Sequence, residues 1–241
     1  MPVTKTIEPH WRSPDNIVAY TSTRLGGVSL GDYHGLNVGA HVGDDLLLVK
    51  ANRALLPQHE KLTWLEQVHS NRVVALPTID TTADAAYSQS PNYYCAVMTA
   101  DCVPILMCNT KGTEVSAVHA GWKGLENGVI ANAVCRFESA PSELLAWIGP
   151  AICKQCYEVD ERVAGVFSSY PDALSTSDSV DKYLLDLPFI AQTQLSALGV
   201  DNVTQSELCT YCRNDLFYSH RRATHQGKRA TGRIVSVIGI K

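Results

Sequence analysis

Residues 99–123 read TADCVPILMCNTKGTEVSAVHAGWK, and the expected fold follows from this stretch. Two short apolar runs, at 103–107 and 115–118, flank a Lys-Gly turn, which is typical of two buried strands. Cys102 stands near the start of the first strand and His119 at the end of the second. The residues Ala-Gly-Trp-Lys-Gly then lead into a helix. Reactive side chains at strand ends are exposed on a rigid frame, so we expect a functional site here.

Three side chains form a candidate metal site. Cys102 and His119 are ligands that transition metals accept, and His69 in the segment 64–71 (WLEQVHSN) supplies a third. Two histidines and a cysteine bind zinc tetrahedrally and leave a fourth position for water, which becomes a nucleophile near neutral pH. The alternative is that each is an ordinary residue, because a lone cysteine in an apolar strand is usually a small core hydrophobe.

Two basic segments are candidates for anion binding. Arg24 precedes a glycine turn, RLGGVS, whose backbone N–H groups and guanidinium suit a phosphate, although a plain hairpin turn with a solvated arginine has the same sequence. In LFYSHRR (216–222), Arg221 and Arg222 stand beside Ser219, a combination suited to bidentate phosphate binding. The alternative for this segment is a basic surface strand.

Polar residues near the candidate ligands complete the predicted site. If residues 64–76 form a strand pair, Gln67 shares a face with His69 and is placed to orient a ligand or water. Asn37 lies in the Gly-, Asn- and Asp-rich loop 31–45 and is assigned to substrate binding. Asp101 precedes Cys102, and the two can serve one site only if the strand ends between them.

Other histidines and basic residues are expected to be solvated. His34 and His41 lie in the 31–45 loop and are not assigned to a metal. The basic residues near the C-terminus are taken as a solvated turn; they are His225, Lys228, Arg229 and Arg233.

Two C-x-x-C pairs, Cys153/Cys156 and Cys209/Cys212, suggest a structural zinc site. Their separation of about 50 residues is far longer than the usual gap in a zinc ribbon. We therefore favour four reduced thiols near one another or near the pocket, and the sequence alone does not settle the choice.

Composition limits the classes of protein that fit. The 241 residues are 45% hydrophobic and 18% charged, as is ordinary for a globular chain, and the net charge is −4. An isoelectric point of about 6.0 argues against a broad nucleic-acid surface. We find neither a signal-type apolar segment nor a membrane span, so we expect no membrane partner and a cytoplasmic location with reduced thiols.

Periodicity gives the remaining elements. Apolar runs predict strands at 17–22, 144–148 and 234–240, and helical spacing predicts helices at 46–56, 125–137, 161–170 and 187–198. No repeat or linker interrupts the chain, so residues 1–241 are expected to form one domain.

Seven motifs occur in a fixed order along almost the whole chain. They are TSTRLGGVS (21–29), GLNVGAHVGDD (35–45), LEQVHSN (65–71), TADCVPIL (99–106), AVHAGWKG (117–124), WIGPAI (147–152) and LFYSHRR…TGR (216–233). Together they resemble the laccase-domain family of the YfiH or YlmD type. Members of that family have been labelled polyphenol oxidases and, later, purine nucleoside phosphorylases.

The resemblance implies a fold, a site and an activity. The fold is α+β, a single-domain layered α/β/β/α sandwich with mixed sheets. The metal ligands map onto His69, Cys102 and His119, with zinc as the metal and copper as the alternative. Asp101 lies near the site as a supporting or proton-handling group, and His220 stands where the family has tyrosine. The activity is phosphate-dependent cleavage of adenosine, inosine, guanosine and methylthioadenosine, with adenosine deamination at the same site.

We therefore expect a zinc enzyme acting on a purine nucleoside and phosphate. Cys102, Asp101 and His119 are the expected catalytic residues, and the expected substrate or phosphate contacts are Arg24, Asn37, Gln67, Arg221 and Arg222. A copper-dependent polyphenol oxidase is disfavoured because the chain has no His-x-His pair. A metal-free cysteine hydrolase would use Cys102 as nucleophile and His119 as base. A non-enzymatic metal-binding or partner-binding protein is the fourth class, and the preferred purine and the oligomeric state stay open.

Overall fold

The predicted strand pair lies at the centre of a six-stranded sheet. The computed structural model describes residues 4–241. The strands of this mixed sheet, in order, are β13 (Asn202–Gln205), β9 (Leu144–Ile148), β7 (Val103–Asn109), β8 (Val115–Ala120), β5 (Ala85–Ser88) and β4 (Val73–Ala75). β7 and β8 pair antiparallel, with Pro104 opposite His119. The pairs β13–β9 and β4–β5 are parallel.

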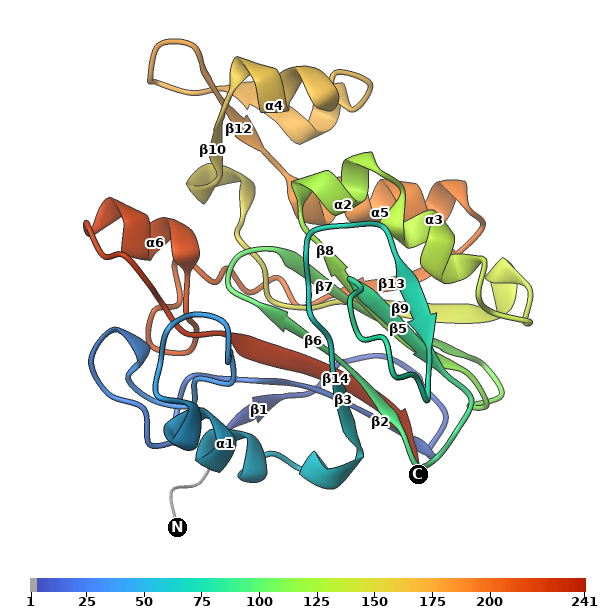
Figure 1. The fold of residues 1–241 in the computed structure, drawn as a ribbon. Coiled ribbons are helices and arrows are strands. Elements are labelled where there is room, and N and C mark those ends of the chain that lie inside the picture. The colour runs from blue at the N-terminus through green and yellow to red at the C-terminus, as the bar shows by residue number, and fades with distance from the viewer. Residues whose placement is uncertain (1–3) are drawn as a thin grey trace.

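A five-stranded sheet packs against the first (Figure 1). Its strands, in order, are β1 (Thr6–Ile7), β2 (Ile17–Ser22), β14 (Ile234–Ile240), β6 (Tyr94–Thr99) and β3 (Leu62–Trp64). The C-terminal strand β14 is central, between β2 and β6, so the two ends of the chain are built into one sheet.

A smaller third sheet stands off from one end of the sandwich, next to a short helix (Figure 1). It consists of β10 (Glu158–Asp160), β12 (Lys182–Leu185) and β11 (Leu174–Thr176), with α4 (Glu161–Val166) beside it.

Alternation along β7 sorts its side chains between two cores. Ile105 and Met107 pack into the cluster that includes the helices on the outer face of the six-stranded sheet. Leu106 and Cys108 point the other way and meet Val97 of the five-stranded sheet. Because successive side chains of a strand face opposite sides, a strand buried on both faces reads as a continuous apolar run.

Helices cover the two outer faces. The outer face of the six-stranded sheet carries α2 (Trp122–Glu126), α3 (Val129–Val134) and α5 (Leu187–Ala197). On the outer face of the other sheet lies α1 (Leu46–Ala54), whose Arg53 guanidinium stacks 3.7 Å from the Trp64 ring centroid. The expected α+β fold, a layered α/β/β/α sandwich with mixed sheets, is confirmed. Within residues 4–241, no helix has the length and apolar character needed to cross a membrane.

One predicted helix differs from the structure, and so does the strand that was the alternative for residues 216–222. The helix expected at 125–137 is two short helices, α2 and α3, because Gly128 adopts a left-handed φ of 79° between them. The basic segment that ends LFYSHRR is the start of a helix, α6 (His220–His225), and not a strand. Ser219 caps it by accepting a hydrogen bond from the Arg222 amide, which explains why a hydroxyl stands directly before the basic run.

One buried carboxylate ties the β7–β8 turn to the segment after α3. Glu114 is 3% exposed and accepts hydrogen bonds from the Tyr87 hydroxyl, from Asn109 and from the amides of Glu138 and Ser139. The Ser139 hydroxyl donates a further one. Burial opposes ionisation of Glu114, but these hydrogen bonds outweigh it and hold the pKa of the carboxyl below its ordinary value.

Glu114→Gln is therefore expected to lower the free energy of unfolding by about 2 kcal/mol near pH 7, because amide donors would lose a charged acceptor. A carboxylate whose folded-state pKa is lowered stabilises the fold fully above the ordinary Glu pKa of about 4.3 and loses that effect as the pH falls through the folded-state value. The difference in unfolding free energy between variant and wild type should therefore be smaller at a pH below the ordinary Glu pKa than near pH 7, measured by urea unfolding at both pH values. Glu126→Gln, at an exposed site on α2, is the matched control. An equal gap at both pH values would contradict the charge argument.

Candidate functional site

The three predicted ligand side chains converge at one end of the central strands β7 and β8 of the six-stranded sheet. Cys102 directly precedes β7, His119 lies in β8, and His69 comes from the loop between β3 and β4. Their ligand atoms all lie within 4.8 Å of one another, and Cys102 Sγ is 3.9 Å from His69 Nε2. Zinc–nitrogen and zinc–sulfur bonds of about 2.0–2.3 Å place tetrahedral ligand atoms roughly 3.3–3.8 Å apart. The donor set therefore fits one zinc ion with small adjustments.

The backbone at the site departs from ordinary strand geometry. The strand pair expected at 64–76 is wrong around His69: β3 ends at Trp64, β4 begins at Val73, and His69 lies in the loop between them with a φ of 59°. Asp101 has a φ of 103° just before β7. Non-glycine residues with positive φ are uncommon and persist where surrounding contacts hold them, often at functional sites.

Asp84, directly before β5, holds both histidines. Its fully buried carboxylate accepts hydrogen bonds from His119 Nδ1 (2.8 Å) and the His69 amide (3.0 Å) through Oδ1, and from the Ser70 amide (2.6 Å) and hydroxyl (2.7 Å) through Oδ2. Burial would raise the pKa of Asp84, but the His119 and Ser70 hydrogen bonds bring it down to about 2. With Nδ1 engaged, His119 offers Nε2 as its free nitrogen, the arrangement in which a carboxylate orients a metal-binding histidine.

The charges of Cys102 and His119 are coupled. Burial would raise the pKa of the Cys102 thiol, but the His119 charge and hydrogen bonds from both imidazoles lower it to about 6. Burial would lower the pKa of His119, but the Cys102 thiolate and Asp84 raise it to about 9. The thiolate is the form of cysteine that binds metals and attacks carbon, so this pair is prepared for either chemistry.

Two hollows of about 300 Å³ each border Cys102, and both are also lined by His69, Ala100 and His220. This volume is at the lower end of the range for small-molecule sites. The hollow that we call the aromatic hollow is lined by His69, Ala100, Asp101, Cys102, Trp122, Lys123, Ile152, Tyr157, Leu187, His220 and Arg221. The other, the inner hollow, is lined by His41, Gln67, His69, Met98, Thr99, Ala100, Cys102, His119, His220 and Arg233.

The three predicted phosphate-binding arginines have different surroundings. Arg221 lines the aromatic hollow, where its guanidinium lies 4.9 Å from the Tyr157 ring and donates to the Glu158 carbonyl. Arg222 donates instead to the backbone carbonyls of the 209–212 turn and of Phe217. Arg24 donates to two backbone carbonyls, stacks on an aromatic ring and lines neither hollow.

Of the other two predicted substrate contacts, Gln67 lines a hollow and Asn37 does not. Gln67 lines the inner hollow, but its side-chain amide is engaged with the Met98 backbone. Its N–H donates to the Met98 carbonyl (2.9 Å), and its oxygen accepts from the Met98 amide (2.7 Å). Asn37 is fully buried and bonded to Asp44 and to two backbone amides, so its contacts serve the loop and not a hollow.

Asp101 anchors helix α6 to the site. Asp101 is 7% exposed, and its carboxylate accepts hydrogen bonds from the Thr210 hydroxyl (2.7 Å) and the Arg221 amide (2.7 Å). The Ile152 amide donates to the backbone carbonyl of Asp101 (2.9 Å). A carboxylate at a helix N-terminus is favoured by the helix dipole. These contacts fix where Arg221 and His220 stand.

Two residues that we expected to be solvated line the inner hollow. His41 comes from the 31–45 loop and Arg233 from the segment before β14. Partial burial, followed by the charge of Arg233, lowers the pKa of His41 below its ordinary value. In the sequence, both residues are recognisable only as members of loops, which favours a solvated side chain. Tertiary packing then brings the two loops beside His69, Cys102 and His119.

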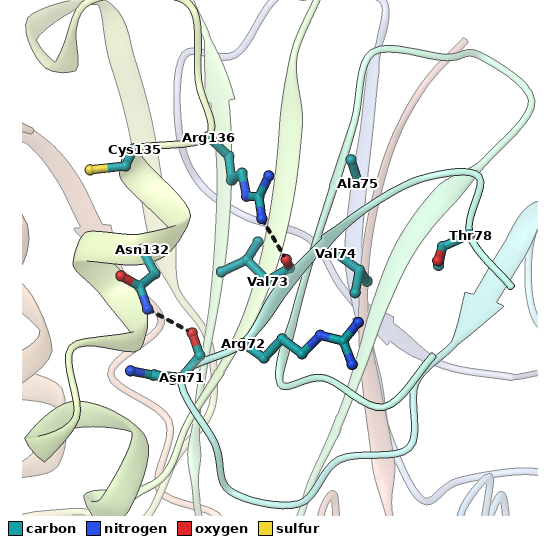
Figure 2. A pocket seen from close by; sticks show the side chains of 9 residues that line it. All are labelled: Asn71, Arg72, Val73, Val74, Ala75, Thr78, Asn132, Cys135 and Arg136. Carbon is teal, nitrogen blue, oxygen red and sulfur yellow. Dashed lines mark hydrogen bonds between the residues drawn. The ribbon is translucent and has the colours of Figure 1, made fainter. Parts of the chain in front are cut away.

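A larger hollow, of about 700 Å³, lies elsewhere, along the edge strand β4 (Figure 2). Its amide and guanidinium groups are already used: Asn132 donates to the Asn71 carbonyl and Arg136 to the Val73 carbonyl. Among the described residues, the groups of three or more potential metal ligands lie outside this groove. Size alone therefore does not mark it as the site of chemistry.

The chain is similar to known proteins along almost its whole length. The family model described as multi-copper polyphenol oxidoreductase laccase matches residues 18–241. The purine nucleoside phosphorylase YfiH of Shigella flexneri is 43% identical over 98% of this chain and 99% of its own. The purine nucleoside phosphorylase YlmD of Geobacillus stearothermophilus is 36% identical, over 92% and 89%. A crystal structure of a Neisseria meningitidis protein matches with a TM-score of 0.90 and 37% identity over 99% of both chains. The chain therefore belongs to the laccase-domain family that contains the YfiH and YlmD proteins, as its seven motifs predict.

Proposed function

We propose that this protein is a zinc-dependent purine nucleoside phosphorylase, with His69, Cys102 and His119 as the metal ligands. The observation that carries the proposal is the convergence of these three donors within 4.8 Å beside a hollow that combines aromatic walls with cations. The curated names of the similar YfiH and YlmD proteins support the same activity. Adenosine, inosine, guanosine and methylthioadenosine are the proposed substrates, and adenosine deamination is the proposed second reaction.

The aromatic hollow suits the two parts of such a substrate pair. Trp122 and Tyr157 give the hollow aromatic side chains that a purine can contact, with the Arg221 guanidinium 4.9 Å from the Tyr157 ring. Arg221 and Lys123 offer the positive charge that a phosphate needs. In phosphorolysis a phosphate oxygen forms a bond to C1′ of the ribose while the bond from C1′ to the base breaks, and the base leaves with a proton. Holding the two reactants together in this orientation is the main contribution of these side chains.

The supporting residues keep the ligand set in one arrangement. When bound, zinc supplies a Lewis acid that polarises a substrate atom. Asp84 fixes the ring of His119 and the backbone of His69, and Asp101 fixes the start of α6 beside the same hollow. Asp101 acts here by positioning Arg221.

A metal-free cysteine hydrolase is the second candidate, favoured by one observation. Cys102, His119 and Asp84 follow one another in contact, as do a nucleophile, its base and the acid that orients the base. A second imidazole, His69, at 3.9 Å from the same sulfur is not needed by such a triad and is needed by a metal site.

Product analysis with adenosine tests the leading proposal. Zinc-loaded protein should release adenine and ribose 1-phosphate only when phosphate is present, and inosine with or without phosphate. Cys102→Ala and chelator treatment should each remove both activities, because each removes the metal site. Activity that survives chelation but not alkylation of Cys102 would favour the hydrolase instead. The absence of any nucleoside product from zinc-loaded protein would overturn the leading proposal.

Arg221→Ala should raise the KM for phosphate about tenfold or more, because a charged hydrogen-bond donor is lost from the hollow. The phosphate-independent formation of inosine should change much less. Steady-state kinetics in both reactions make the measurement, and Arg12→Ala, at an exposed position remote in sequence, is the control. An unchanged KM for phosphate would exclude Arg221 as a phosphate contact.

Asp84→Asn should weaken zinc binding by His69, Cys102 and His119 about 10–100-fold, because the carboxylate that orients both histidines becomes an amide. Competition with a zinc-binding dye measures the affinity, and circular dichroism checks that the variant is folded. Asp201→Asn, on the exposed surface, should bind zinc as the wild type does. A folded Asp84→Asn protein with unchanged affinity would show that the carboxylate does not support the ligands.

A further inference from the structure

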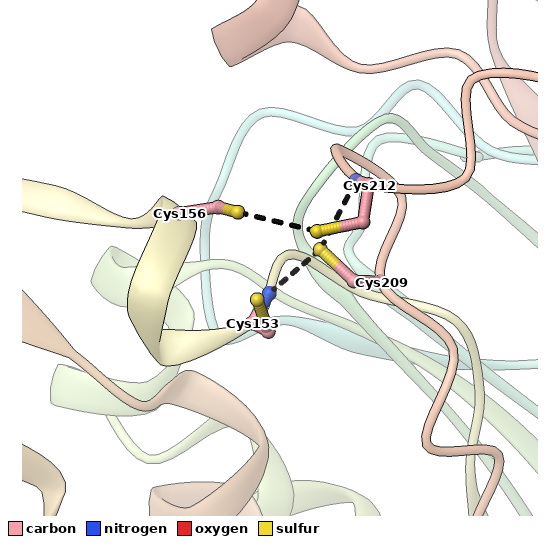
Figure 3. Close-up of side chains that lie close together, drawn as sticks. All are labelled: Cys153, Cys156, Cys209 and Cys212. Carbon is pink, nitrogen blue, oxygen red and sulfur yellow. Dashed lines mark hydrogen bonds between the residues drawn. The ribbon is translucent and has the colours of Figure 1, made fainter.

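A second cluster of sulfur atoms lies outside the candidate active site. Cys153 and Cys156 bracket the turn between β9 and β10, and Cys209 and Cys212 bracket the turn between β13 and α6 (Figure 3). The two pairs are far apart in the sequence, yet all four Sγ atoms lie within 4.8 Å of one another. The long separation that argued against a shared site in the sequence is closed by the fold.

The spacing of the sulfur atoms fits a tetrahedral ion. A zinc–sulfur bond of about 2.3 Å places the four sulfurs of a tetrathiolate roughly 3.8 Å apart. The Cys156 and Cys212 sulfurs are 3.5 Å apart, close to this separation and well beyond the roughly 2.05 Å of a disulfide. All four cysteines are free thiols in the structure.

The surroundings favour a thiolate at Cys209, whereas burial raises the pKa of the Cys153 and Cys156 thiols. The Sγ atom of Cys209 accepts hydrogen bonds from the Cys153 amide (3.3 Å) and from the Cys212 amide (3.4 Å). Amide donors of this kind orient and stabilise the ligands of a metal site. The Arg222 guanidinium bonds the carbonyls of Thr210 and Tyr211, so a positive charge lies against the turn that carries two of the sulfurs.

We propose that Cys153, Cys156, Cys209 and Cys212 bind one zinc ion as four thiolates, and that this ion fixes one wall of the candidate active site. Each thiol releases its proton to solvent as the zinc–sulfur bonds form. Soft thiolate ligands in a tetrahedral arrangement select zinc over harder divalent ions. This proposal does not depend on the reaction that the active site performs.

Both cysteine turns contact the active-site wall directly. Ile152, next to Cys153, donates its amide to the Asp101 carbonyl, and Thr210, next to Cys209, donates its hydroxyl to the Asp101 carboxylate. The Thr210 amide also donates to the Ala151 carbonyl, so the two turns already run side by side. An ion that joins them would hold Asp101, and through it the start of α6, in place.

Metal analysis of the full-length chain tests the zinc site. Protein purified under reducing conditions and equilibrated with zinc should hold two zinc ions per chain, and Cys212→Ser should hold one fewer than the wild type. Cys135→Ser is the matched control, because Cys135 is an exposed free thiol outside both clusters, and it should keep the wild-type content. His69→Ala should lose the other ion. Full zinc content in Cys212→Ser, iron in place of zinc, or a Cys156–Cys212 disulfide in the reduced preparation would overturn the proposal.

Thiol labelling of the wild type gives a test that needs no variant to fold. Zinc should protect Cys153, Cys156, Cys209 and Cys212 from alkylation, while Cys135 is labelled at the same rate with and without zinc. Equal labelling of the four cysteines in both conditions would overturn the zinc site.

Hydrogen exchange tests the effect on the wall. The amides of Ile152 and Thr210 should exchange about tenfold faster in Cys212→Ser than in Cys135→Ser, because local opening is no longer restrained by the ion. Unchanged exchange at both amides would overturn the positioning role.

Discussion

The antiparallel pairing of β7 with β8 is the constraint on which the rest of the molecule depends. Both strands are buried on both faces, so their register is fixed by two cores at once, and that register sets Pro104 opposite His119. Cys102 then lies at the same end of this strand pair as His119. A slip of one residue would exchange the two cores and separate the sulfur from the imidazole. The stability of the sandwich and the geometry of the candidate site are therefore specified by the same hydrogen bonds.

Two buried carboxylates hold the irregular segments around the site in fixed positions relative to the sheet. Asp84 binds the His69 loop to β8, and Asp101 binds α6 and the 210 turn to the start of β7. His69 and His220 are themselves exposed, so packing of their own side chains does not hold them in place. A charged acceptor with several donors can define a position without such packing, because each unmade bond to a buried carboxylate is costly.

The strands and the three candidate ligands could be predicted from the sequence more fully than the residues that support them. The runs at 103–107 and 115–118 carry their own pattern, so the central pair could be predicted, and the motifs identified His69, Cys102 and His119. Asp84 could not be found, because it stands in a polar segment without periodicity and meets His119 only through the pairing of β5 with β8. The split of α2 from α3 was missed because the apolar spacing continues through Gly128, while the break is a matter of backbone φ. Arg221 and Arg222 are neighbours in sequence, but the helix that begins at His220 sends one guanidinium to the hollow and the other to backbone carbonyls.

The strained positions suggest how the site is kept ready. His69 and Asp101 both have positive φ, and each is held by hydrogen bonds that come from segments distant in the chain. Such backbone conformations cost roughly 1–3 kcal/mol each, so the surrounding contacts must outweigh that cost before any ligand arrives. His69 and the start of β7 are therefore placed by the fold itself, unlike the ligands of small zinc modules, which unfold without their metal. A site assembled in advance loses little conformational entropy on binding. The two hollows share His69 and Cys102, so part of the wall of each is held in place before any ligand binds.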